Sequence, residues 1–276
     1  MSGPERVRGA FDAAASDGRT ALIAYILSGY PTEADALAAA EAALAAGADL
    51  LEVGVPFSDP LADGPTIADA GRISLAAGGG LPSAQRLVTA LREGRDAPIL
   101  VMTYLNPLLA AGEHETLTSL RAAGADGLIV PDLPAGGSPR LERLAASLGL
   151  AMSFLVAPNT SPARIVAALR ASTGFLYVVP LLGVTGARDR VASGAADLLD
   201  SVRRNAAGRV PVAAGFGLST PAQVAALAPA ADGLIIGSAL VAAMRDGGPS
   251  RMGALVRSLA AATSRGVPSA ARDMRP

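Results

Sequence analysis

Short apolar runs recur along the chain, and each is followed by an alanine-rich segment of helical composition. The runs are nearly continuously apolar and do not alternate with polar residues, which is typical of strands that are covered on both faces. The sequence therefore predicts eight buried strands, which lie within residues 21–29, 50–56, 98–104, 127–134, 151–158, 175–182, 210–217 and 233–240.

The segments between these runs carry helix start and stop signals. Residues 32–48 and 161–172, for example, have Ser, Thr or Pro near the start, and the first of them has Gly near its end. Repeated strand-then-helix units predict a parallel sheet with helical crossovers. Eight such units in about 250 residues fit an α/β fold, a closed (β/α)8 TIM barrel with extra helices. An open, doubly wound sheet is the alternative.

The chain shows no shift of composition that would mark a second domain. We therefore expect residues 1–265 to form a single barrel domain. Residues 266–276 lack apolar periodicity and are expected to fray.

Composition and charge exclude some classes of binding partner and some kinds of catalytic site. The net charge is −1, so nothing favours a nucleic-acid partner. There are no cysteines, and the single histidine, His114, lies in a polar segment and is interpreted as solvent-facing, so a metal site and a Ser-His-Asp triad are not expected. No apolar run approaches the ~20 residues of a membrane helix, and the first residues lack a signal peptide pattern. We expect a soluble, cytoplasmic protein.

Candidate chemistry concentrates in LEVGVPFSDPLADGP, residues 51–65, where a strand opens into a loop. Glu52 lies inside the apolar run with no cation beside it, and a buried carboxyl of this kind has a raised pKa, which suits a group that gives and takes a proton. A glutamate hydrogen-bonded to a tyrosine or to backbone inside the barrel is the alternative. Asp63 is either a second functional acid or a turn or cap residue, and Asp59 is interpreted as a turn residue or a contact to a partner.

Three glycine-rich stretches follow the last strands. They are GVTGA (183–187), AGFGLS (214–219) and IGSAL (236–240), and the last of them begins a predicted helix. Loops after strands seven and eight of such barrels commonly bind phosphate, and glycine leaves backbone N–H groups open to an anion. Each stretch alone could be an ordinary tight turn. Together they favour a substrate that carries a phosphate.

The motifs LEVGVPFSDPLADGPTI, VMTYLNP, IVPDLP, GVTG, AGFGLS and IGSALV occur in this order, and through them residues 21–243 resemble the tryptophan synthase alpha subunit family. The resemblance implies retro-aldol cleavage of indole-3-glycerol phosphate into indole and glyceraldehyde 3-phosphate, in tryptophan biosynthesis. It also implies that indole passes to a separate, pyridoxal-phosphate-dependent beta subunit in an alpha2-beta2 complex. It implies no cofactor or metal for this chain.

By position in the motifs, the resemblance assigns the catalytic acids to Glu52 and Asp63. It further assigns substrate contacts to Tyr25, Tyr104, Tyr177, Gly186, Phe216, Gly217, Gly237 and Ser238. The chain departs from the family at Pro180, Leu181 and Leu182, where members usually carry a small polar residue and often Arg or Thr.

That departure is the only feature that favours a stand-alone lyase releasing free indole. A non-catalytic regulatory barrel and another phosphate-binding barrel, such as a sugar-phosphate isomerase, are the remaining alternatives.

Overall fold

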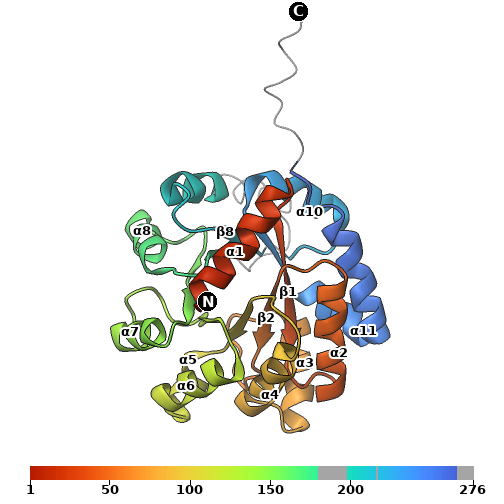
Figure 1. Cartoon of the computed structure of the whole chain (residues 1–276). Coiled ribbons are helices and arrows are strands. Elements are labelled where there is room, and N and C mark those ends of the chain that lie inside the picture. Colours follow the sequence, from red (N-terminus) through yellow and green to blue (C-terminus); the bar gives the residue numbers. More distant parts are fainter. Residues whose placement is uncertain (180–197, 216, 266–276) are drawn as a thin grey trace, which may run out of the picture.

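The computed structural model describes residues 1–179, 198–215 and 217–265, drawn in colour in Figure 1. Five residues with expected roles, and the expected tail 266–276, lie outside the described residues: Pro180, Leu181, Leu182, Gly186 and Phe216.

The described strands form one parallel sheet in the order β5-β4-β3-β2-β1-β9-β8-β7-β6. They are β1 (Ala21–Leu27), β2 (Leu50–Gly54), β3 (Ile99–Met102), β4 (Gly127–Ile129), β5 (Ala151–Ser153), β6 (Leu155–Val156), β7 (Leu176–Val178), β8 (Val212–Ala214) and β9 (Gly233–Ile236). Every predicted run contains a strand, and the fifth run contains two, β5 and β6.

Phe154 separates β5 from β6, which occupy the two ends of the strand order. The first and last strands of the sheet therefore belong to one short stretch of chain, and the sheet curls into a nearly closed barrel. The predicted barrel is confirmed, and the open doubly wound sheet is excluded.

Helices surround the sheet, as Figure 1 shows. They are α1 (Gly3–Ser16), α2 (Glu33–Ala45), α3 (Pro65–Ala76), α4 (Leu81–Arg92), α5 (Leu105–Ala110), α6 (Glu113–Ala123), α7 (Pro139–Ser147), α8 (Pro162–Ala171), α10 (Pro221–Leu227) and α11 (Ser238–Ala260), with a further helix over 198–206. Helix α11 is kinked, because Gly247 and Gly248 have non-helical backbone angles and Pro249 follows them.

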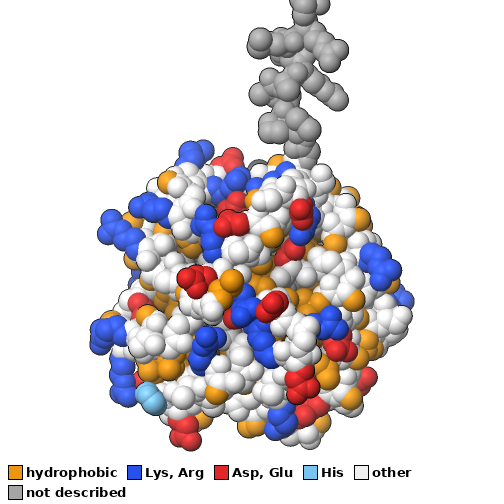
Figure 2. Space-filling view, viewed as in Figure 1, with side chains coloured by type: hydrophobic (Ala, Val, Ile, Leu, Met, Phe, Trp, Pro, Cys, Tyr) orange, Lys and Arg blue, Asp and Glu red, His pale blue; other side chains and the backbone are white. Residues whose placement is uncertain are grey.

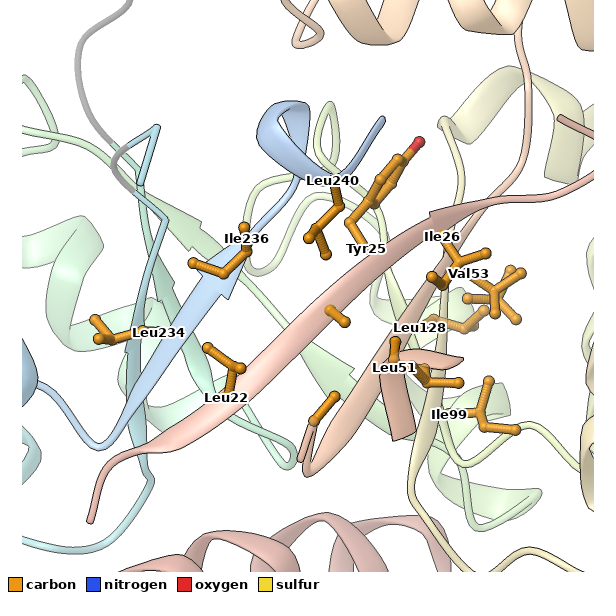
Figure 3. Packing of buried hydrophobic residues seen from close by; sticks show 14 of the residues in the cluster. Leu22, Tyr25, Ile26, Leu51, Val53, Ile99, Leu128, Leu234, Ile236 and Leu240 are labelled. Carbon is orange, nitrogen blue, oxygen red and sulfur yellow. The ribbon is translucent and has the colours of Figure 1, made fainter. Parts of the chain in front are cut away.

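Alternate residues of each strand face opposite ways, and both faces are apolar for most of the strand. Leu51 and Val53 of β2 pack outward in the large cluster between strands and helices, part of which is shown in Figure 3. Leu50 belongs to a second cluster inside the barrel. Because Glu52 and Gly54 follow Leu50 at a spacing of two, they also face the interior.

The N-terminal helix α1 closes one end of the barrel, a feature that the sequence analysis did not anticipate. Val7, Phe11 and Ala14 lie on one buried face and join the cluster inside the barrel. The Phe11 ring contacts that of Phe175, with 5.8 Å between centroids, and fills the space left by the absent side chain of Gly233, the first residue of β9. Helix α1 therefore covers the amino-terminal ends of the strands and lies across the centre of the ring in Figure 1.

Surface charge follows the balanced composition. Basic and acidic side chains are interspersed on the face shown in Figure 2. His114 lies exposed in the first turn of α6, as expected. Among the described helices, none combines the length and the hydropathy that a bilayer crossing requires.

Candidate active site

A cavity of about 490 Å³ lies at the carboxyl ends of the strands, opposite α1. It brings together seven of the residues expected at the site: Tyr25, Glu52, Asp63, Tyr177, Gly217, Gly237 and Ser238. They come from β1, β2, β7, the start of α11 and the loops after β2 and β8.

Glu52 lies on the cavity wall with no exposed surface in the residue as a whole. Neither of its carboxyl oxygens has a hydrogen-bond partner among the described residues. Burial in this apolar strand raises the pKa of Glu52 to about 8, so the carboxyl is largely protonated at neutral pH. The described residues therefore do not support the alternative, in which Glu52 is a structural residue hydrogen-bonded to a tyrosine or to backbone.

Two tyrosines frame Glu52, and each occupies space that a glycine leaves free. Tyr25 pairs with Glu52 in the register of β1 and β2, and its ring lies where a side chain on Gly54 would stand. Across the cavity, the Tyr177 hydroxyl lies 2.8 Å from the position that a β-carbon on Gly215 would take. Sequence reasoning missed Gly54 as a site residue and named Gly215 only as part of the glycine-rich stretch AGFGLS. The available signal was a glycine beside the end of an apolar strand, which often marks a close approach.

We expect Gly54→Ala to impair the site by displacing Tyr25. The new methyl group would overlap the Tyr25 hydroxyl and ring. The ring would then have to move into the cavity, where there is space for it. KM for the substrate should rise about tenfold, and overpacking should lower the free energy of unfolding by about 1–3 kcal/mol. Steady-state kinetics and denaturant titration measure both.

Gly9→Ala in α1 is the matched control, because nothing lies within 4 Å of the added β-carbon. It should leave KM unchanged and raise stability by up to about 1 kcal/mol, since alanine is the better helix former. An unchanged KM in Gly54→Ala would contradict the packing of Tyr25 described above.

Asp63 lies in the loop between β2 and α3 and also faces the cavity. It does not cap α3, whose N-cap is Gly64. Burial raises the pKa of Asp63 to about 6, against a smaller opposing effect of hydrogen bonding with Tyr104. The two acids of one cavity therefore differ in their protonation at neutral pH, Glu52 being mostly neutral and Asp63 mostly ionised.

Tyr104, which was expected on the substrate side, is absent from the cavity wall and supports the loop that carries Asp63. Its hydroxyl accepts a hydrogen bond of 2.9 Å from the Ala62 N–H, and its ring packs against Phe57 at a centroid distance of 5.2 Å. Asp59 is exposed in a turn of the same loop, where its carbonyl accepts the Leu61 N–H.

The opposite wall presents backbone to the cavity. Gly237 is the N-cap of α11 and Ser238 its first residue, so the unpaired N–H groups of a helix start lie at the cavity. Gly217 has φ +64°, a left-handed conformation that favours glycine. No lysine, arginine or histidine lines the cavity among the residues described, so the groups that this part of the wall offers to an anion are N–H groups and the Ser238 hydroxyl.

The remaining wall is mostly apolar and suits a flat aromatic ring. Its aliphatic residues, which the sequence analysis did not single out as site residues, are Ile67, Met102, Leu155, Val156, Val179 and Ile235. Asn159 and Thr160, in the loop after β6, add polar groups at the rim.

Comparison with known proteins agrees with this geometry. The family model for the tryptophan synthase alpha chain matches residues 11–265. The tryptophan synthase alpha chain of Deinococcus radiodurans is 43% identical over 265 residues, covering 95% of this chain and 96% of the relative. That of Streptomyces coelicolor is 43% identical over 256 residues, covering 92% and 94%.

Solved structures give the same result. A chain of tryptophan synthase from M. tuberculosis superposes with a TM-score of 0.86 at 37% identity, covering 95% of this chain and 99% of that one. The alpha chain from Legionella pneumophila gives a TM-score of 0.85 at 27% identity, covering 95% and 97%. The protein described here belongs to the tryptophan synthase alpha chain family.

Proposed function

We propose that Glu52 and Asp63 of this carbon–carbon lyase cleave indole-3-glycerol phosphate into indole and glyceraldehyde 3-phosphate. One observation carries the assignment: two carboxyls face one cavity, and their different burial gives them different protonation states at neutral pH. The apolar wall accommodates the indole ring, and the start of α11 accommodates the phosphate.

Cleavage requires proton transfers that suit Glu52. The bond to indole C3 breaks only after C3 has been protonated, and the protonated Glu52 carboxyl supplies that proton. The carboxylate that remains then accepts the proton of the glycerol hydroxyl as that carbon becomes the aldehyde. Glu52 thus ends the cycle protonated, as it began.

Asp63 has a different role. Protonation at C3 leaves positive charge on the ring nitrogen, and an ionised carboxyl that accepts the N–H stabilises that charge. The pKa of about 6 keeps Asp63 ionised at neutral pH. The Tyr104 support described above fixes the loop from which Asp63 acts.

The residue inventory favours acid–base catalysis over a covalent aldolase route. The sequence contains no lysine, so the cleavage cannot run through a Schiff base to a lysine of this chain. Glu52 and Asp63 are the described carboxyls that face the cavity.

We further propose that the protein acts in the cytoplasm as the alpha subunit of a tryptophan synthase complex. The support is its family and its likeness to chains of solved tryptophan synthase. Indole release by the purified chain, measured with and without a beta subunit, tests the assignment. Strong stimulation by the beta subunit supports it, whereas fast release that the beta subunit leaves unchanged would indicate a stand-alone lyase.

The two pKa values predict a bell-shaped pH dependence of kcat/KM. Activity should rise as Asp63 ionises near pH 6 and fall as Glu52 loses its proton near pH 8. Initial rates of indole formation from pH 5 to 9.5 measure both limbs. A profile that is flat across this range would contradict the assigned roles.

A further inference from the structure

The Tyr25 hydroxyl has no role yet in the fold or in the proton transfers described above. Tyr25 is buried, with 6% of its surface exposed, and its ring, although on the barrel side of β1, also contacts residues of the large cluster shown in Figure 3. Figure 3 shows its oxygen directed away from the aliphatic side chains of that cluster. No hydrogen bond between described residues involves this hydroxyl, although the residue lines the cavity.

The position of the hydroxyl relative to Glu52 follows from the pairing of β1 and β2. Tyr25 is the register partner of Glu52, and both side chains point into the barrel. The tyrosine oxygen lies over Gly54, two residues beyond Glu52 toward the mouth. The hydroxyl thus stands on the mouth side of Glu52, the side from which substrate enters. Tyr25 and Glu52 both line the cavity, and the two carboxyl oxygens of Glu52 have no hydrogen-bond partner among the described residues.

We infer that Tyr25 is a positioning residue, whose hydroxyl donates a hydrogen bond to the Glu52 carboxylate once Glu52 has given its proton to the substrate. The inference rests on the proposed function. The bond would stabilise the ionised form at the stage when Glu52 must remain in place and accept the second proton. It would also offset part of the desolvation that an unpaired buried carboxylate suffers.

The groups around Tyr25 keep its hydroxyl protonated, so that it can donate a hydrogen bond. Burial, and next the carboxyls of Asp63 and Glu52, raise the pKa of Tyr25 well above its usual range, so the phenol stays protonated. The titratable groups that face Glu52 are Asp63 from the loop after β2, Tyr25 from β1 and Tyr177 from β7. Tyr177 lies across the cavity from β2, whereas Tyr25 lies on the strand that adjoins β2 and is the register partner of Glu52.

Tyr25→Phe removes the hydroxyl and keeps the ring. We expect kcat to fall about tenfold with little change in KM, which is the size of effect of one hydrogen bond to a charged group. The alkaline limb of the pH profile should move to higher pH, because the ionised form of Glu52 loses its donor. Steady-state kinetics across pH measure both effects.

A second readout does not depend on turnover. In protein labelled with 13C at the glutamate carboxyl, the signal that disappears in Glu52→Gln belongs to Glu52, and its pH titration gives the midpoint directly. The midpoint should lie higher in Tyr25→Phe than in the wild type. The matched control is Tyr30→Phe, a buried tyrosine outside the cavity wall, and it should change neither the midpoint nor the kinetics.

These experiments distinguish a failure of the Tyr25 inference from a failure of the proposed function. A Tyr25→Phe protein with an unchanged Glu52 midpoint and unchanged kcat overturns the inference, as does a rise in KM alone, which would indicate contact with substrate only. Failure of the wild type to cleave indole-3-glycerol phosphate would overturn the proposed function, while the carboxyl titration would still report whether Tyr25 acts on Glu52.

Discussion

Glu52→Gln is expected to lower kcat for indole formation by about 10³-fold, because an amide of the same shape can neither donate nor accept the proton that cleavage requires. The same change is expected to make the variant more stable than the wild type at alkaline pH. The stability effect originates in the burial of a carboxyl that lacks a partner among the described residues.

The sign of the stability effect follows from the raised pKa. Folded Glu52 holds its proton up to about pH 8, whereas an unfolded glutamate releases it near pH 4.5. Between these values the native state binds more protons than the unfolded state, so wild-type stability falls as pH rises. Glutamine does not titrate, so its stability advantage over the wild type should grow by roughly 3 kcal/mol from pH 5 to pH 8.

Urea denaturation of both proteins at several pH values measures this difference, and the slope with pH is independent of any fixed penalty for burying the amide. Glu115→Gln, the same change at an exposed position of α6, should alter neither turnover nor the pH slope. A Glu52→Gln enzyme that turns over normally would remove Glu52 from the mechanism.

Asp63→Asn is expected to lower kcat/KM by about 10²-fold, because the neutral amide cannot balance positive charge on the indole nitrogen. The acidic limb of the pH profile should disappear with the group that causes it, and the limb assigned to Glu52 should remain. The pH dependence of indole formation measures both.

Asp69→Asn, an exposed change in the neighbouring helix α3, is the matched control and should retain full activity. Persistence of the limb near pH 6 in Asp63→Asn would show that another group causes it.

The strands could be predicted from the sequence because burial on both faces makes each of them a continuous apolar run. The division of the fifth run at Phe154 could not, since the composition of β5 and β6 is alike and only closure of the ring separates them. Helix α1 was missed because its buried face consists of a few apolar residues, such as Val7 and Phe11, among polar ones. These residues are buried only because they pack into the open end of the barrel, which the local sequence does not reveal.

The site was predictable to the extent that its chemistry interrupts the apolar pattern. Glu52 stood out as a carboxyl inside a buried strand, and Asp63 as an acid in the following loop. Gly54 was missed because its role depends on a tyrosine from another strand, a contact that local sequence does not encode. The position of Tyr104 behind the Asp63 loop likewise depends on packing between segments far apart in the chain.

The closure of the amino-terminal end of the barrel by α1 has a consequence for how substrate and products reach and leave the cavity. With the amino-terminal end sealed by Phe11 and Phe175, the cavity in the described part of the chain has its exit at the carboxyl ends of the strands. We expect substrate to enter, and both products to leave, at this end of the barrel. A partner subunit that receives indole without loss to the solvent must therefore bind over this end of the barrel. It must also leave an opening through which glyceraldehyde 3-phosphate can dissociate.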